Sequence, residues 1–299
     1  MSRPQDRHRA PHAAGGDTVR QQIAALNQQA WELSDTDAKQ ALALSTVAYD
    51  LASAPSNGAP FDQEGIATSL RTQGYLNMRL GDYPLGLSQL NRALAIFEAL
   101  ASAGTTPEGL ADVYDGTAGI YAQIGIWPEA LAYMHKQLAA ADRIDDPRRV
   151  ANAYNNLANT YMELGQHDRA VETLQRNLQL GIEIGYPRIE CLSYLNLAEA
   201  YLLTGAWALA RDNALLALRR SQEEGFEMFE VYGYEILGKA CRQMGDISAS
   251  LQYLDEAMAA SRRMASLVTE VLILLELGQT NRAADRLFGQ NLIDRLAPE

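Results

Sequence analysis

The sequence predicts an all-α fold, a right-handed α-solenoid of antiparallel helix pairs, because several residue types share one long period. Glycines recur 44, 40, 40 and 40 residues apart, at Gly81, Gly125, Gly165, Gly205 and Gly245. Tyrosines recur every 40 residues, at Tyr114, Tyr154, Tyr194 and Tyr234. Prolines keep the same interval, at Pro107, Pro147 and Pro187. A fixed period of this length is typical of repeat proteins, in which each repeat packs on its neighbours.

The composition supports helices. The chain has 299 residues, of which 47% are hydrophobic and only 7% aromatic, and alanine and leucine dominate. Neither residue loses much side-chain freedom in a helix. The length alone would suggest about two domains, but a period that runs through the chain favours one continuous core.

The beginning of the chain departs from the repeat pattern. Residues 1–16 are expected to form a disordered tail, and the solenoid is expected to span 17–299. An opening helix pair is predicted over 18–53, with a capping box in which Thr18 is followed by a glutamine three residues later. Its turn lacks the periodic glycine and uses Ser-Asp-Thr-Asp at 34–37.

Five clear repeats are predicted between about 65 and 264, each a pair of amphipathic helices. In the unit 147–186, the first helix has an apolar stripe spaced i, i+3, i+4 and i+7, namely Tyr154, Leu157, Ala158 and Tyr161. Gly165 is expected to end this helix, because glycine adopts the left-handed backbone of a helix end at little cost. The second helix has a stripe of its own, at Ala170, Val171, Leu174 and Leu178.

These residues resemble the tetratricopeptide repeat family. Its sequence pattern appears at Tyr154, Leu157, Ala158, Tyr161, Gly165 and Ala170, and again forty residues later. The common repeat of that family has about 34 residues, so a period of forty implies its long-helix variant. The resemblance covers roughly residues 18–296 and implies a superhelix whose concave groove, lined by the first helix of each repeat, binds proteins or peptides.

A shorter closing pair is predicted over 265–297, with its turn at Gly278. The helix before this turn, 266–278, is apolar nearly all round, and its outward stripe would be Val268, Leu272 and Leu275. A helix that is apolar all round is normally buried. Two alternatives remain open: a homo-oligomer or docked domain covers 266–278, or the closing helix folds over it.

The charge and the cysteines exclude several classes of protein. The formal net charge is −12, which argues against nucleic acid or an anionic membrane as a partner. Residues 1–20 hold four arginines and two aspartates, so the remainder carries −14 and favours a basic partner. No apolar run approaches the ~20 residues that span a bilayer. Cys191 and Cys241 form no disulfide or zinc pattern, so we expect two small buried hydrophobes and a cytoplasmic location.

Catalytic signatures are weak. Residues 233–240 resemble a phosphate-binding loop, but they lie inside a predicted helix, and Ala240 stands where magnesium binding needs a hydroxyl. We therefore interpret Gly233 and Gly238 as small packing positions. The four histidines show no metal-ligand spacing. The chain is expected to be no enzyme and to need no cofactor or metal.

The candidate binding surface is the groove side of the first helices. In the unit 147–186 that stripe holds four asparagines, Asn152, Asn155, Asn156 and Asn159, and Asn196 continues the row in the next repeat. Each amide offers a donor and an acceptor, which suits the backbone of an extended peptide. For Asn156 and Asn196, a structural role in internal hydrogen bonding is favoured. For Asn152, Asn155 and Asn159, a structural and a binding role both stay open.

The other candidate residues follow the same stripe through the repeats: Arg71, Arg79, Glu199, Lys239 and Arg242. The stripe is basic in the first clear repeat and acidic in the next, at Asp112 and Asp115. This order departs from the carboxylate clamp of the resembled family, which needs basic residues on successive first helices. Three leucines on the stripe argue for a surface covered either by a ligand or by the chain's own neighbouring repeats, at Leu192, Leu195 and Leu202.

The sequence thus favours a non-catalytic scaffold that binds a protein or extended peptide in the groove. An alternative is the sensor module of a bacterial signalling protein, since residues 26–52 and the long-helix repeats resemble the regions that precede nucleotide-cyclase or transcriptional output domains. The chain would then be a fragment, or would act on an output domain in another protein.

Overall fold

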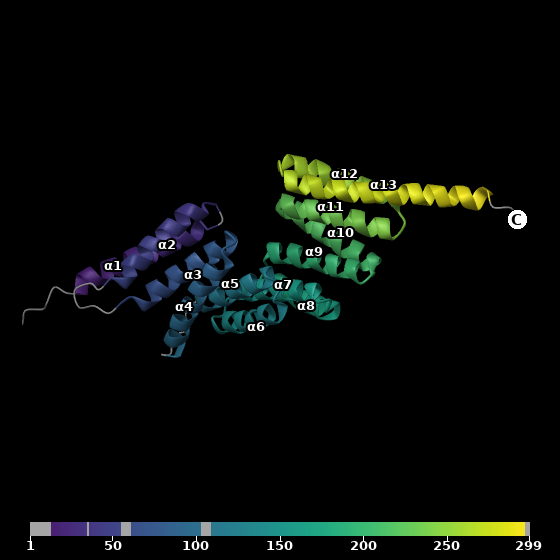
Figure 1. Ribbon diagram of the computed structural model, residues 1–299. Helices are drawn as coiled ribbons and strands as arrows, with labels where there is room; N and C mark the ends of the chain where they lie inside the picture. Colours follow the sequence, from purple (N-terminus) through teal and green to yellow (C-terminus); the bar gives the residue numbers. More distant parts are fainter. Residues whose placement is uncertain (1–12, 35, 55–60, 103–108, 297–299) are drawn as a thin grey trace, which may run out of the picture. The chain divides into compact units, whose positions relative to one another are not determined.

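The structure is a computed structural model that describes residues 13–34, 36–54, 61–102 and 109–296, with side chains described between 18 and 287. These ranges contain thirteen α-helices and no strand. They are α1 (Ala13–Glu32), α2 (Ala38–Ser53), α3 (Gln63–Arg79), α4 (Tyr83–Ser102), α5 (Gly109–Gln123), α6 (Trp127–Arg143), α7 (Pro147–Glu163), α8 (His167–Glu183), α9 (Pro187–Leu203), α10 (Trp207–Glu224), α11 (Glu227–Gln243), α12 (Ile247–Arg263) and α13 (Leu267–Leu296). The predicted all-α fold of antiparallel helix pairs is confirmed (Figure 1).

The chain divides into two compact units, Met1–Arg149 and Val150–Glu299, which we call unit 1 and unit 2 and describe separately. In each unit consecutive helices pack on one another, as α3 does on α4 and α11 on α12. First helices of neighbouring pairs also pack together, as α1, α3 and α5 do in unit 1. The same holds for α9, α11 and α13 in unit 2. That residues 17–299 form a single solenoid stays a prediction.

Two series of left-handed residues end the helices. The turns within helix pairs use the glycines found from the sequence, with φ between 69° and 84°: Gly81, Gly125, Gly165, Gly205 and Gly245. The turns between pairs form a second series spaced by forty residues, at Asp145, Gly185, Gly225 and Ala265. Asp145 and Ala265 both have φ of 53° although a side chain disfavours that conformation. The repeat geometry therefore requires a left-handed residue at both turns.

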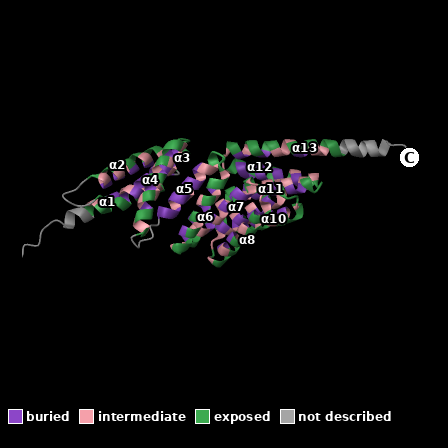
Figure 2. Cartoon of the chain, turned by 60° about the horizontal axis from the view of Figure 1, so that its bottom comes forward, coloured by how far each residue is buried: buried purple, intermediate pink, exposed green. Residues whose placement is uncertain are grey.

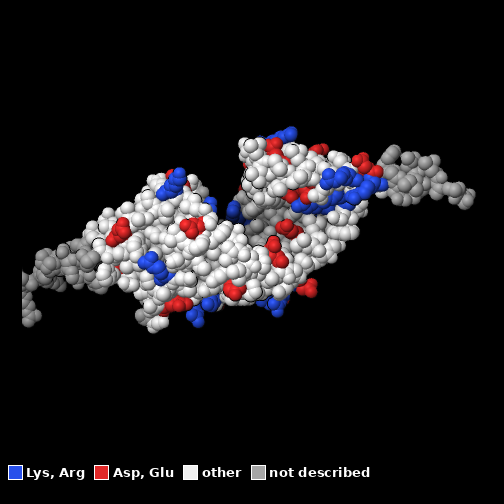
Figure 3. Space-filling model, in the orientation of Figure 1, with Lys and Arg blue, Asp and Glu red and all other residues white. Residues whose placement is uncertain are grey.

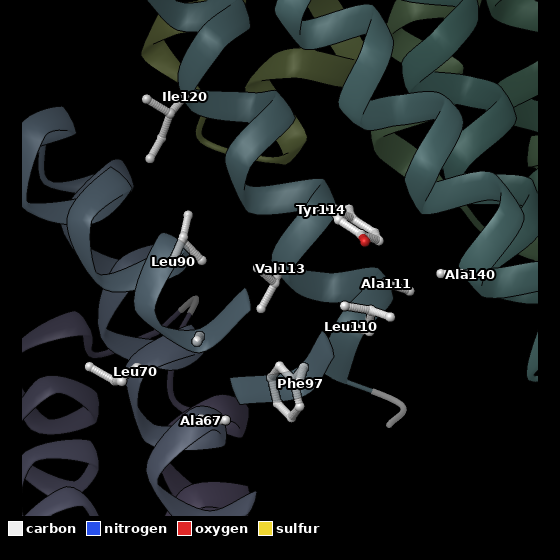
Figure 4. Packing of buried hydrophobic residues seen from close by; sticks show 11 residues of the cluster. Ala67, Leu70, Leu90, Phe97, Leu110, Ala111, Val113, Tyr114, Ile120 and Ala140 are labelled. Carbon is white, nitrogen blue, oxygen red and sulfur yellow. The ribbon is translucent and has the colours of Figure 1, made fainter. Parts of the chain in front are cut away.

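The core of unit 1 lies between α3, α4 and α5. Figure 4 shows Leu90 and Phe97 of α4 together with Leu110 and Val113 of α5. The backbones come close where the residues are small: a Cβ on Gly74 of α3 would lie 2.6 Å from Leu90 Cγ. This contact requires glycine at that position.

The core of unit 2 resolves the question of the three groove leucines. Leu195 is buried, and Leu192 and Leu202 pack beside it in one cluster. The same cluster contains Phe229 and Ile236 of α11, the first helix of the next pair. The leucines of α9 are therefore covered by the chain's own neighbouring repeat.

The predicted closing pair is wrong, because α13 is one helix of 30 residues that continues through Gly278 (Figure 1). Gly278 is not among the glycines with positive φ. A glycine inside a helix is unfavourable by only about 1 kcal/mol relative to alanine. Two residues later Thr280 is buried, and its hydroxyl lies 3.2 Å from Ser250 Oγ of α12. That contact favours continuing the helix across α12 over turning.

The beginning of the chain also differs from expectation. Helix α1 starts at Ala13, inside the predicted tail, so Thr18 lies within the helix and the predicted capping box is wrong. Residues 1–12 of the predicted tail lie outside the described part. Asp37 caps α2 by accepting a hydrogen bond from Gln40 N at 3.0 Å, in the turn predicted at 34–37.

None of the helices in the described ranges combines the length and the hydropathy that crossing a membrane requires.

Candidate binding faces

The predicted asparagines of unit 2 lie together on one face, which we call the amide face and define as Asn152, Asn155, Asn156 and Asn159 of α7 with Asn196 of α9. Asn152 and Asn159 are exposed, and the other three are half-buried. Asn196 donates from Nδ2 to Asn155 Oδ1 at 2.6 Å and so joins α9 to α7. The structure therefore contains a bonded pair, Asn155 and Asn196, and an exposed pair, Asn152 and Asn159, while a binding role for these residues stays a prediction.

Asn156 is half-buried, unlike its exposed neighbours Asn152 and Asn159. Its backbone carbonyl accepts a hydrogen bond from Thr160 Oγ1 at 3.0 Å. The side chains of Asn155 and Asn196 are held by their mutual hydrogen bond, while Asn152 and Asn159 are exposed. Glu199 of α9, one turn after Asn196, is exposed beside them.

Lys239 and Arg242 of α11 belong to an ionic network with α13. Lys239 Nζ lies 2.6 Å from Glu235 Oε1 and 3.8 Å from Glu276 Oε1. Arg242 Nη1 lies 2.8 Å from Glu276 Oε2 and also donates to the Glu276 carbonyl and to Thr280 Oγ1, at 3.3 and 3.4 Å. Two cations and two carboxylates therefore balance one another, and neither predicted cation carries an uncompensated charge.

In unit 1, Arg71 forms what we call the aspartate bridge with Asp112 and Arg149. Arg71 Nη1 lies 2.8 Å from Asp112 Oδ2, and Arg149 Nη1 pairs with the other carboxylate oxygen. The Arg71 guanidinium also lies 4.3 Å from the ring centre of Trp31. The basic residue of one repeat and the acidic residue of the next therefore pair with each other, as Arg71 of α3 does with Asp112 of α5.

The aspartate bridge forms one wall of a cavity of about 710 Å³. Its other lining residues include Arg20, Asn27 and Trp31 of α1 and Glu64 of α3. Neither Trp31 nor Arg149 was singled out from the sequence. Arg79 lies elsewhere on α3, exposed, with its guanidinium 6.0 Å from the Tyr75 ring centre, so Arg71 and Arg79 do not form a joint site.

A second hollow of about 400 Å³ lies between α11 and α13 in unit 2. It is lined by Arg242, Gln243, Gln279, Arg282, Ala283 and Arg286. We call Arg242, Arg282 and Arg286 the arginine pocket. The sequence analysis named only Arg242, since the predicted turn at Gly278 would have placed the other two on a different helix. The period itself was a signal, because Arg242 and Arg282 are forty residues apart.

The cysteines are buried and free, as predicted. Burial raises the pKa of the Cys191 thiol to about 11, because a thiolate is poorly solvated inside the protein. Burial likewise raises the pKa of Cys241. Both thiols are therefore poor nucleophiles at neutral pH.

In the segment 233–240, which resembles a phosphate-binding loop, packing requires a small residue at Gly238, as predicted, but not at Gly233. An added Cβ on Gly233 would lie at an ordinary contact distance of 3.5 Å from Leu218 Cβ. This segment is the middle of α11, and a Cβ on Gly238 would lie 2.7 Å from Leu254 Cγ of α12. Among the residues whose side chains are described, no group of three His, Cys, Asp or Glu is placed to hold a metal ion.

Comparison with known proteins supports the fold. Residues 109–183, and again 149–223, match the family model described as the tetratricopeptide repeat. BtubC from P. vanneervenii aligns with a TM-score of 0.60 and 18% identity, over 83% of this chain and 92% of that one. Aspartyl phosphate phosphatase F from Bacillus subtilis aligns with a TM-score of 0.64 and 11% identity, over 92% and 83%. No curated protein sequence matches the chain.

A third solved structure is a signal transduction ATPase with numerous domains from Pyrococcus horikoshii, described as carrying a tetratricopeptide repeat sensor. It aligns with a TM-score of 0.63 and 15% identity, over 93% of this chain and 44% of that one. Identities this low show a shared fold alone. The family match and the shared fold together confirm the resemblance predicted from the sequence.

Proposed function

With tetratricopeptide repeats over residues 109–223 as the premise, we propose that the protein is a non-catalytic scaffold that binds an extended protein segment on the amide face of unit 2. The observation that carries this proposal is the division of that face into fixed and exposed amides. Asn155 and Asn196 hydrogen-bond to each other and join α7 to α9, while Asn152 and Asn159 are exposed on α7.

The spacing of the exposed amides suits an extended chain. Asn152 and Asn159 lie two helical turns apart on α7, about 10.5 Å along the axis. Three residues of an extended peptide span about 10 Å. Each asparagine can donate to a carbonyl and accept from an N–H. The two side chains can therefore hydrogen-bond to backbone groups three residues apart, whatever the side chains of the peptide between them are.

The charge of the chain supports a basic segment as the partner. The formal net charge is −12, and Glu199 is exposed beside the amide face. A negative field of this kind raises the rate at which basic partners associate. The remaining predicted residues contribute less, because Arg71, Lys239 and Arg242 are paired within the chain.

The test is the affinity of the full chain for a basic peptide selected against it from a random library. Replacing both exposed amides, in Asn152→Ala/Asn159→Ala, should weaken binding at least about tenfold, since each lost pair of hydrogen bonds is worth about 1 kcal/mol. Gln175→Ala on α8, an exposed amide of a second helix, is the matched control and should leave the affinity unchanged. Equal affinities of the double variant and the control would exclude the amide face.

A regulatory sensor is the second candidate function. It is supported by the fold shared with the Pyrococcus horikoshii protein, whose description includes a tetratricopeptide repeat sensor. In that case binding at the amide face would control an output domain carried by a longer chain or by another protein. A nucleotide-cyclase or transcription factor that co-purifies and changes activity with the peptide would support it, and an output unaffected by the peptide would exclude it.

We also propose a cytoplasmic location and self-association through α13. The two free buried cysteines support a reducing compartment. The first half of α13 supports self-association because its apolar side chains are exposed, at Leu267, Val268, Val271, Leu272, Leu274 and Leu275 (Figure 2). Sedimentation of the full chain tests this, and a monomer at high protein concentration would contradict it.

A further inference from the structure

We propose that the arginine pocket of unit 2 binds a phosphomonoester group. Arg242 comes from α11, and Arg282 and Arg286 come from successive turns of α13. All three line the same hollow of about 400 Å³. Figure 3 shows Lys and Arg side chains gathered on α13 next to its grey end. This proposal stands independently of peptide binding at the amide face.

The pocket exists because α13 does not turn at Gly278. Gln279, Arg282, Ala283 and Arg286 follow the spacing i, i+3, i+4 and i+7, which places them on one face of a continuous helix. Ala283 is small and leaves room between the two arginines. A turn at Gly278 would have placed these residues on a second helix, away from α11.

Arg242 is the fixed member of the pocket. Its side chain is only 13% exposed and is held by Glu276 at 2.8 Å. Its three hydrogen bonds, to Glu276 Oε2, the Glu276 carbonyl and Thr280, all leave from Nη1. In the described part of the chain, Nη2 and Nε make no hydrogen bond and remain available to a ligand.

The uncompensated charge of the arginine pocket favours a ligand with two negative charges. Lys239 and Arg242 are neutralised by Glu235 and Glu276. Arg282 and Arg286 are exposed, and neither forms an ion pair with any side chain between residues 18 and 287 that the structure describes. Two guanidinium groups therefore carry about two uncompensated positive charges.

A phosphomonoester carries about −1.5 to −2 charges at pH 7 and three strong acceptor oxygens. Guanidinium groups bind such oxygens with paired hydrogen bonds. A single carboxylate would satisfy only one of the two exposed arginines. The amides of Gln243 and Gln279, on the wall of the hollow, offer further donors.

One carboxylate lies near the pocket and has to be considered. Asp285 is exposed on α13, three residues after Arg282, a separation at which side chains can meet. It does not line the hollow, and no ion pair joins it to either arginine in the described structure. It reduces the local positive field without occupying the site.

The experiment is a titration of the full chain, followed through the Nε–Hε NMR signals of its arginines, at constant ionic strength. Inorganic phosphate should shift a small set of these signals saturably, and at lower concentration than acetate does. Arg282→Ala/Arg286→Ala should weaken phosphate binding about tenfold or more. Arg282→Lys/Arg286→Lys keeps the charge but loses the paired geometry, so its affinity should fall between the two.

The matched control is Arg219→Ala, which removes an exposed arginine of α10 outside the pocket and should bind phosphate as the unchanged chain does. Shifts that are equal with phosphate and chloride, or that persist in the double alanine variant, would overturn the proposal.

Two further arms identify the source of the phosphate. A phosphoserine peptide that binds more tightly than free phosphoserine, and whose unphosphorylated form does not bind the pocket, identifies a phosphorylated protein segment. Equal affinities of the peptide and free phosphoserine identify a small phosphate-bearing molecule. Either result supports the phosphate site. If neither the phosphoserine peptide nor free phosphoserine binds, the proposal is contradicted.

Discussion

The aspartate bridge of unit 1 and the arginine pocket of unit 2 use similar residues in opposite ways. In unit 1 two arginines from α3 and α7 converge on Asp112 of α5, which lies between them in sequence. In unit 2, Arg282 and Arg286 lie on α13, and no carboxylate among the described side chains forms an ion pair with them. Whether a charged residue on a first helix is paired or exposed therefore depends on the residues that the neighbouring repeat places against it, and much less on its position in its own repeat.

The largest expected effect comes from breaking the aspartate bridge. Asp112→Ala removes the carboxylate that pairs with the largely buried Arg71 and with Arg149, although Arg149 keeps its ion pair with Asp146. The free energy of unfolding should therefore fall by about 2–4 kcal/mol, mainly through Arg71. Urea denaturation of the full chain measures this. Glu172→Ala breaks an ion pair whose side chains are more than 60% exposed, and it should change stability by less than about 0.5 kcal/mol. Similar losses in both variants would show that the bridge is no better held than a surface pair.

The second prediction contrasts a true turn glycine with the helical Gly278. Gly245 has φ of 84°, so Gly245→Ala should destabilise the chain by about 1–2 kcal/mol. A Cβ on Gly278 would meet only Arg282 Nη1, at 3.9 Å. Gly278→Ala should therefore stabilise the chain by about 0.5–1 kcal/mol. Thermal unfolding measures both, and a loss on Gly278→Ala would indicate a turn there and remove the basis of the arginine pocket.

The third prediction concerns the turn that leads into α13. Ala265 has φ of 53°, which glycine adopts without strain, so Ala265→Gly should stabilise unit 2 by about 0.5–1 kcal/mol. Ala259 is an exposed residue inside α12, and Ala259→Gly should destabilise by about 1 kcal/mol. The two identical substitutions should shift the unfolding temperature in opposite directions. A downward shift for both would mean that residue 265 is not held in the left-handed conformation.

The last prediction, with the smallest expected effect, compares the alkylation rate of a buried thiol in unit 2 with that of an exposed thiol on α13. Burial raises the pKa of Cys191 to about 11, so iodoacetamide should modify it slowly at pH 8. In Leu275→Cys, a thiol at a position 59% exposed should react as an ordinary thiol, with a pKa near 8.5. Mass spectrometry separates the two sites, and rapid alkylation of Cys191 would contradict its burial.

The same shift gives a pH dependence. The folded pKa of Cys191 lies above the unfolded value, and the charged form is the deprotonated one. Titration of Cys191 therefore leaves the free energy of unfolding unchanged below about pH 9 and lowers it as pH rises from about 9 towards 11. Cys191→Ala should reduce this loss.

The helix pairs could be predicted from the sequence because the residues that set them repeat. The glycines of the first turn series were found for this reason, whereas Asp145 and Ala265 of the second series were missed because they are not glycine. Gly278 misled the prediction because the same residue ends helices and is tolerated inside them. Contacts of Thr280 with Ser250 and Arg242 distinguish the two cases, and a single sequence does not reveal them.

The sequence predicted which polar residues share a helix face, but it did not predict which of them bond to each other across neighbouring helices. The asparagines of α7 and α9 were found because they share a stripe with the spacing of a helix. Their partners were missed because each stripe was considered one helix at a time. Two of the bonds that join neighbouring first helices have the same sequence separation of 41 residues, Arg71 with Asp112 and Asn196 with Asn155. A search for polar pairs at that separation would have found both.

The most direct measurement of the proposed function is where a bound peptide lies. A selected basic peptide that carries a photo-crosslinker should, after illumination and mass spectrometry, be attached within residues 152–159 of α7 and 196–199 of α9. The Asn152→Ala/Asn159→Ala variant should lose these crosslinks while keeping its circular dichroism spectrum. Crosslinks confined to second helices, such as α8 or α10, would contradict the proposal that the amide face binds the partner.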